Sequence, residues 1–373
     1  IEACLVGSEM CIRDRSYSEM YAQGGRVASQ IETGDEHFAD GDYDNAIKYY
    51  KKALKNAPNH ADGKYKLAMS FYRKKNYSQA IRYGEEILAD ASQTPAVNVF
   101  RMVGNGYDLH GNYKKAIETL EKGLEKYPRS GSIFLDLGLI ELLREHPIEA
   151  ITYWERGIEA EPTYPDNYFW AAKAYAESEE KMWALLYGEI FMNIERGTER
   201  FDEMSSVIFN LYLDLMRDEA SVTTGEIKFE RKGVNSFEEA HKRLYSILHK
   251  NGMMSFERGN TLYGGVNEIK AVSMMRQNFL ELWLQGFILK YSNTLYKHQR
   301  SMMDLTFFEA YNYWLFSKAS TDDFMNWMEK NSAKYDIFID WFLSNPLKVD
   351  VVDYVVRHQF VDENAEQPKK EKQ

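Results

Sequence analysis

Two stretches of this chain repeat one pattern: "GDYDNAIKYYKKALKNAP" at residues 41–58 and "GNYKKAIETLEKGLEKYP" at residues 111–128. Each places a glycine, an Ala-Ile pair and a proline in the same register. Aligning the rest of the chain on the alanine adds three segments, so that Ala46, Ala80, Ala116, Ala150 and Ala184 are separated by 34, 36, 34 and 34 residues. A period of this length is typical of stacked helical hairpins. We therefore expect five repeats, at 27–60, 61–94, 97–130, 131–164 and 165–198.

Small residues recur inside each expected repeat. The eighth position holds Gly34, Ala68, Gly104, Gly138 and Ala172, and the twentieth holds the five alanines. We expect these two positions to face one another, so that the two helices of a hairpin approach closely. Large residues at position 24, such as Tyr50, Leu120 and Trp154, are expected to fill the space between neighbouring repeats. Prolines at 58, 128 and 162 should end the second helix, because proline lacks the N–H donor and clashes with the preceding turn.

This pattern resembles the tetratricopeptide repeat over about residues 27–198. The resemblance implies an all-α fold: a right-handed superhelix, or α-solenoid, whose first helices line a concave groove that binds an extended or helical segment of a protein partner. By the same resemblance, the residues facing the groove are Asp35, Phe38, Tyr65, Met69, Tyr72, Asn98, Arg101, Asn105, Asp108, Phe169 and Lys173. Several of these side chains could instead pack against the next helix.

One binding mode of the family can be tested on the residues. Arg101 and Asn105 resemble one third of the clamp with which some tetratricopeptide domains hold a C-terminal carboxylate. The following repeat should add cations, but it offers Ser132 and Asp136. We do not expect that clamp here.

The repeat period is lost after about residue 200. Helical patterns continue near 201–218, 236–249, 264–299, 303–318, 321–343 and 347–358, and residues 199–361 are expected to form an aromatic-rich helical C-terminal domain. Phe279, Trp283, Phe287 and Tyr291 recur every four residues. Such a stripe could line a ligand pocket, but aromatic stripes are more often core. Residues 362–373 are polar enough to form a disordered tail.

The N-terminal stretch has a different character. Residues 1–26 are expected to be foreign or disordered, since "CLVGSEMCIRDR", which contains both cysteines, Cys4 and Cys11, resembles translated sequencing-adaptor sequence. "MYAQGG" at 20–25 resembles the end of a bacterial signal peptide, with Ala22 at the cleavage position. On this interpretation the natural N-terminus is missing, and an exported, periplasmic protein is favoured over a cytoplasmic one.

Composition and motifs exclude several classes of function. The net charge is -11, whereas a nucleic-acid binder needs a basic face. No apolar run reaches the roughly 20 residues of a transmembrane helix. Asp40, Asp42 and Asp44 begin like a calcium loop, but Asn45 and Lys51 replace the required Gly and Glu. The sequence predicts no catalytic residue, metal or cofactor.

These observations predict a non-enzymatic scaffold that binds a protein or peptide. The alternative is a ligand-binding or catalytic C-terminal domain with the repeats as its docking arm. A deep cavity lined by His, Asp, Glu or Arg within 236–360 would favour that alternative. Self-association is a third possibility.

Overall fold

The computed structural model describes residues 24–92, 94–217, 226, 234–251, 267–349 and 354–362. The adaptor-like stretch with Cys4 and Cys11, the "MYAQGG" motif and the tail from residue 363 lie outside these ranges, so the predictions about them stay predictions. Contacts between Cα atoms divide the chain into two units, residues 1–128 and 129–373. The predicted boundary between repeats and C-terminal domain, at 198/199, stays a prediction, and each unit is described by itself.

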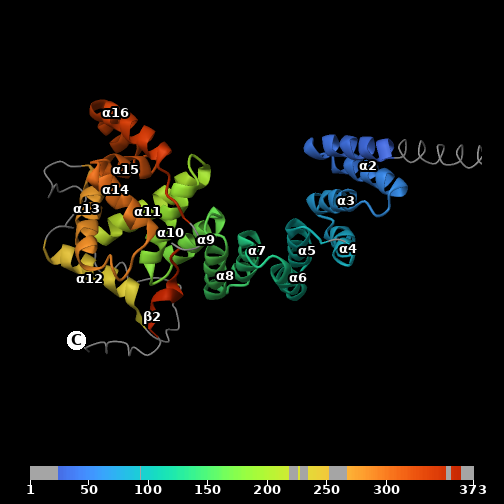
Figure 1. Ribbon diagram of the computed structural model, residues 1–373, viewed down its shortest axis with the longest axis horizontal. Coiled ribbons are helices and arrows are strands. Elements are labelled where there is room, and N and C mark those ends of the chain that lie inside the picture. The colour runs from blue at the N-terminus through green and yellow to red at the C-terminus, as the bar shows by residue number, and fades with distance from the viewer. Residues whose placement is uncertain are drawn as a thin grey trace, which may run out of the picture. The chain divides into compact units, whose positions relative to one another are not determined.

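The first unit consists of helical hairpins (Figure 1). A helix at 24–39 precedes the others, and asparagine or aspartate side chains cap each second helix: Asp42, Asn76 and Asn112 accept a hydrogen bond from the backbone N–H three residues on. Such caps satisfy N–H groups that a helix start leaves open. The helices are α2 (Tyr43–Asn56), α3 (Ala61–Arg73), α4 (Tyr77–Leu88), α5 (Val97–Leu109) and α6 (Tyr113–Lys126).

The second unit begins with two further hairpins and continues into a helical assembly (Figure 1). Two-residue strands β1 and β2 pair antiparallel, with Val234 opposite Asp362. The elements are α7 (Gly131–Leu143), α8 (Pro147–Ala160), α9 (Pro165–Ala176), α10 (Lys181–Ile194), α11 (Glu199–Arg217), β1 (Val234–Asn235), α12 (Ser236–Lys250), α13 (Glu268–Gly286), α14 (Thr294–Asp304), α15 (Phe308–Leu315), α16 (Thr321–Ser344), the 3₁₀ helix η2 (Arg357–Phe360) and β2 (Val361–Asp362). The all-α solenoid expected from the repeats is the fold of the hairpins.

The glycines at position eight lie against the large residue at position 24, a contact that was not predicted. The atoms nearest to a Cβ built on Gly34, Gly104 and Gly138 belong to the position-24 side chain of the same repeat, at 2.5, 2.6 and 2.2 Å. The expectations that these glycines also face the alanine, and that position 24 fills the space between repeats, stay predictions. The missing side chain makes room for a large residue within its own hairpin. The five alanines are buried as expected.

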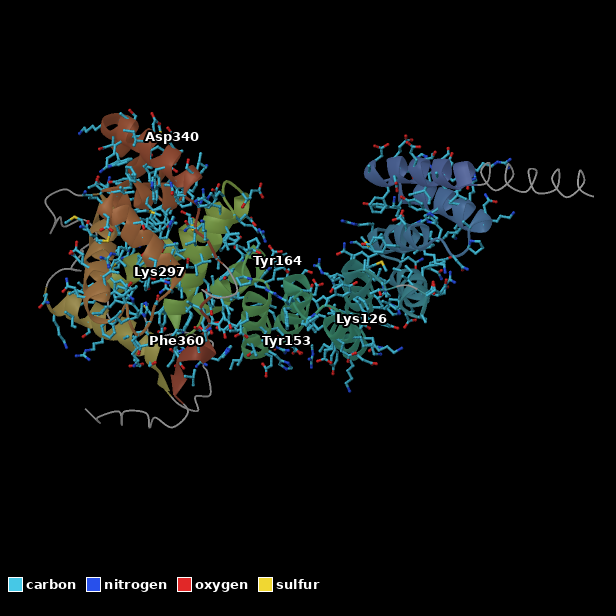
Figure 2. The ribbon with its side chains drawn as sticks, viewed as in Figure 1. Lys126, Tyr153, Tyr164, Lys297, Asp340 and Phe360 are labelled. Atoms are coloured by element: carbon cyan, nitrogen blue, oxygen red, sulfur yellow. The ribbon has the colours of Figure 1, made fainter. Side chains whose placement is uncertain are left out.

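The aromatic residues of the second unit form its core. Phe279, Trp283 and Tyr291 are buried in one hydrophobic cluster, which confirms core rather than a ligand pocket for most of the stripe. Phe287 is partly buried against the same cluster. Figure 2 shows side chains filling the space between the ribbons of this unit.

Two of the helices predicted for the second unit differ from those observed. The expected helix at 264–299 is two helices, α13 and α14, because Gly286 ends the first. The expected helix at 347–358 is wrong: residues 347–349 and 354–356 are not helical, and only η2 follows. Proline at 346 and the valines after it favour an extended backbone. This segment includes Pro346, Leu347, Val349 and Arg357.

Candidate functional site

The first helices of the first unit carry most of the residues predicted to bind a partner. The helix at 24–39, α3 and α5 contribute them, and we call this set the first-helix surface. Most of its members are partly buried, and Asn98 is exposed. The set consists of Asp35, Phe38, Tyr65, Met69, Tyr72, Asn98, Arg101, Asn105 and Asp108.

Asp35 joins three helices through its carboxylate. One oxygen accepts a hydrogen bond from the hydroxyl of Tyr50 on α2 at 2.7 Å. The other oxygen pairs with the ammonium group of Lys66 on α3 at 2.6 Å. Burial and this neighbouring carboxylate together raise the pKa of the Tyr50 hydroxyl. Asp35 therefore has a structural role whether or not it also contacts a partner.

The surface combines aromatic rings with a cation. Burial raises the pKa of the Tyr65 hydroxyl, and the positive charge of Arg101 opposes that shift, so the phenol and the guanidinium lie near one another. Phe38 packs edge-on to Tyr43, and Tyr72 packs in the same way on Tyr77, with ring centroids 5.4 and 5.6 Å apart. The aromatic bodies are thus held by neighbours, while part of each residue stays accessible.

The two predicted residues of the second unit have different environments. Phe169 is 3% exposed and packs on Phe191, with ring centroids 5.0 Å apart. Lys173 pairs with Glu203 at 2.6 Å and lies over the ring of Trp170. Phe169 contributes to the core, and we leave it out of the proposed contact surface.

A buried ionic network in the second unit was missed by the sequence analysis. The Arg276 guanidinium donates to both oxygens of Glu189 at 2.6 Å, and Gln299 and Tyr311 donate to the same carboxylate. Burial disfavours charge on Arg276, but Glu189 outweighs it and holds the arginine's pKa above its ordinary value. This network joins α10 to α13, α14 and α15. The only sign of this network in the sequence was Glu189, a charged residue among the mostly apolar residues of α10.

A small cavity adjoins this network. It has a volume of about 20 Å³ and is lined by Glu189, Tyr212, His241, Arg276 and Tyr296, among others. Burial lowers the pKa of His241 to about 3, so the imidazole is neutral, and its ring nitrogens bond the Phe237 carbonyl and the Tyr296 hydroxyl. Polar groups converge here, but the volume accommodates about one water molecule. The cavity does not favour the catalytic alternative.

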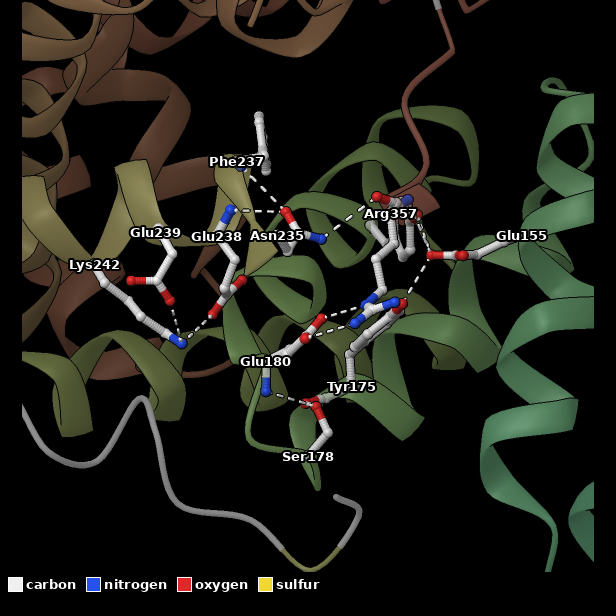
Figure 3. Close-up of polar contacts among 11 residues, drawn as sticks. Glu155, Tyr175, Ser178, Glu180, Asn235, Phe237, Glu238, Glu239, Lys242 and Arg357 are labelled. Carbon is white, nitrogen blue, oxygen red and sulfur yellow. Dashed lines mark hydrogen bonds and ion pairs between the residues drawn. The ribbon is translucent and has the colours of Figure 1, made fainter. Parts of the chain in front are cut away.

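A second buried charge cluster fixes the C-terminal segment (Figure 3). Arg357 of η2 forms two hydrogen bonds to Glu180, a carboxylate with no exposed surface, at 2.6 and 2.9 Å. Its backbone N–H reaches Glu155, which also accepts the hydroxyls of Tyr175 and Tyr187. Burial raises the pKa of Glu155. The segment is thereby fastened to α8 through Glu155 and to the N-cap of α10, Glu180.

Two absences hold for the residues that the structure describes. No group of three His, Cys, Asp or Glu side chains there is arranged to hold a metal ion. Within the same residues, every helix is too short or too polar to cross a membrane.

The hairpins, their 34-residue spacing and the glycine contacts define a helical-repeat protein. Residues 31–95 match the family profile of the tetratricopeptide repeat. This part of the chain is similar to the tetratricopeptide repeat. The comparison with curated proteins gave no match.

Solved structures with similar folds include three tetratricopeptide or related proteins. MamA is 22% identical, with 46% of this chain and 93% of that chain covered and a TM-score of 0.38. YrrB, described as a TPR protein with an unusual peptide-binding site, is 20% identical, with coverages of 44% and 84% and a TM-score of 0.34. PilF of Pseudomonas aeruginosa is 19% identical, with coverages of 71% and 99% and a TM-score of 0.43.

Proposed function

We propose that this protein is a non-enzymatic scaffold and that its first-helix surface binds an extended or helical segment of another protein. The observation that supports this most is the placement of Tyr65, Met69 and Tyr72 on α3 beside Asn98, Arg101 and Asn105 on α5. Large side chains that are held but only partly buried supply contact area at little cost in conformational entropy.

Polar groups on the same surface would fix the partner's register. Arg101 and the two asparagines supply hydrogen-bond donors, and Asn98 is exposed. Side-chain amides can both donate to and accept from a peptide backbone. The proposed partner is therefore a polypeptide whose apolar side chains pack on the α3 aromatics while its backbone bonds to α5.

Affinity capture followed by mass spectrometry tests the proposal. The full chain is compared with the triple variant Tyr65→Ala/Arg101→Ala/Asn105→Ala. A matched control changes three exposed residues on second helices, Lys55→Ala/Glu121→Ala/Lys126→Ala. We expect the triple variant to lose specific partners and the control to retain them. Retention of every partner by the triple variant would reject the first-helix surface as the site.

A further inference from the structure

A cavity of about 370 Å³ lies in the second unit where the end of α10 meets the extended segment after α16. It is lined by the polar residues Thr163, Asn193 and Arg196 and by the apolar residues Pro346, Leu347 and Val349. This volume is within the range of small-molecule sites. The residues that line it belong to the second unit, whereas the first-helix surface belongs to the first, and Asn193 links the cavity to the buried network around Glu189 and Arg276.

Arg196 has no carboxylate partner in the described residues, although burial removes much of its hydration. Its Nε donates to the backbone carbonyl of Asn193 at 3.1 Å, and its guanidinium lies 4.0 Å from the ring centroid of Phe342. The Nη2 atom is buried and has no hydrogen-bond partner. Burial lowers the pKa of Arg196, which means that the charged form lacks full compensation. A buried charge usually has a partner, and a bound anion would supply one.

Asn193 has a buried acceptor atom without a donor among the described residues. It is 3% exposed, and its amide Nδ2 donates to the Glu189 carbonyl and to the Tyr311 hydroxyl. These two bonds identify the other amide atom as oxygen. That Oδ1 is buried and has no hydrogen-bond donor in the described structure. Two residues that line the cavity, three positions apart, therefore carry one unused donor and one unused acceptor.

Positive charge also surrounds the neighbouring cavity, which has a volume of about 310 Å³ and shares Pro346 and Leu347 with the first. Lys297, His298 and Lys348 line it. No aspartate or glutamate of the described residues lines either cavity. Burial, with Arg196 adding to it, lowers the pKa of His298 to about 4, so its imidazole is neutral and the positive charge comes from Lys297 and Lys348. In a chain with a net charge of -11, this local excess of cations favours an anionic ligand.

We propose that the cavity at Arg196 binds a small carboxylate that carries a neighbouring N–H group, with the carboxylate on the Arg196 guanidinium and the N–H donated to Oδ1 of Asn193. The guanidinium fork matches carboxylate geometry. Both a free acylated amino acid and the C-terminus of a peptide have this chemistry. The proposal does not depend on the proposed function, because the residues belong to a different surface.

Calorimetric titration of the full chain tests the site with N-acetylglycine as probe. Acetate lacks the N–H group, N-acetylglycinamide lacks the carboxylate, and a tetrapeptide with a free C-terminus represents the polypeptide source. We expect N-acetylglycine to bind more tightly than acetate and the glycinamide not to bind. Tighter binding of the tetrapeptide would assign the site to peptide C-termini, and weaker binding would assign it to free small molecules. Equal binding of acetate and N-acetylglycine would overturn the role of Asn193.

Arg196→Gln is expected to weaken N-acetylglycine binding by about tenfold or more, since charge-assisted hydrogen bonds are the stronger ones. The matched control, Arg217→Gln, removes a partly exposed arginine that pairs with Asp214 on α11 and should bind like the original chain. Thr163 lines the cavity and is exposed, so Thr163→Trp should narrow the cavity and weaken binding without disturbing the core. It serves as the second variant if Arg196→Gln does not fold. The proposal is overturned if the original chain binds no carboxylate, or if the altered chains bind as tightly as it does.

Discussion

Gly138 of α7 lies directly against the indole of Trp154 of α8: a Cβ at Gly138 would be 2.2 Å from Nε1. Gly34 has the same relationship to Tyr50, and Gly104 to Leu120. The large residue on the second helix differs among these three repeats, whereas the residue on the first helix is glycine in all three. A missing Cβ on the first helix therefore sets how closely the two helices of a hairpin approach.

Replacing Gly138 by alanine should destabilise the protein. Alanine ordinarily favours a helix over glycine by about 1 kcal/mol, but here Trp154 must move, and overpacking of this kind costs about 1–3 kcal/mol. We expect the free energy of unfolding in urea to fall. Gly286→Ala is the matched control, because a Cβ there meets nothing within 4 Å, and it should leave stability unchanged or raised. Equal stability of both variants would contradict the close packing.

In the second and fourth repeats, the turn between the two helices contains a non-glycine residue with a strained, positive φ. The first and third repeats hold Gly41 and Gly111 at the same position, with φ of 77° and 85°. The equivalent positions in the second and fourth repeats hold Lys75 and Glu145, each with φ of 62°. We expect Lys75→Gly and Glu145→Gly each to stabilise the protein by about 0.5–1 kcal/mol, since left-handed strain exceeds the entropic cost of glycine. Lower unfolding temperatures would show that the prediction is wrong.

The Glu180–Arg357 pair should be strongly coupled. Removing one partner leaves the other charge buried, so Arg357→Gln and Glu180→Gln should each cost about 3–5 kcal/mol. The double variant should cost much less than the sum of the two. A double-mutant cycle by urea unfolding measures this coupling. The exposed pair Arg217 and Asp214 serves as control, with an expected coupling below about 1 kcal/mol. Additive losses at Glu180 and Arg357 would rule out strong coupling between the two side chains.

One buried and one partly buried histidine, His241 and His298, should make stability depend on pH. The pKa of His241 is lowered to about 3 and that of His298 to about 4, from 6.5. Between these values and 6.5, the unfolded chain binds more protons than the folded one, so the free energy of unfolding falls as the pH is lowered. Each group contributes at most about 1.4 kcal/mol per pH unit. His298→Gln should reduce the slope between pH 6.5 and about pH 5. An unchanged slope would contradict burial of His298.

The hairpins could be predicted from the sequence because their determinants are local. Pro147 is the first residue of α8, a position where the missing N–H of proline costs little. Pro58 and Pro128 each follow a helix that ends two residues earlier. The contact between position 8 and position 24 was missed, since the periodicity indicates which residues share a face but not which side chain reaches the other helix.

The polar clusters of the second unit could not be predicted, because their partners are distant in sequence. Glu189 and Arg276 are 87 residues apart, and Glu180 and Arg357 are 177 apart. The segment after α16 was expected to be helical, yet Val356 has extended angles, with φ of -136° and ψ of 156°. Tertiary contacts decide both features. Asn193 and Arg196 offered no signal beyond two polar residues at a helix end.

The scaffold function is tested most directly by the affinity of a peptide selected by display against the full chain. Its dissociation constant is measured for the original chain, for Tyr65→Ala/Arg101→Ala/Asn105→Ala and for the control Lys55→Ala/Glu121→Ala/Lys126→Ala. We predict that the first triple variant binds about 100-fold more weakly or worse, as loss of central contacts implies, while the control binds as the original does. Equal affinity of all three chains would contradict binding at the first-helix surface.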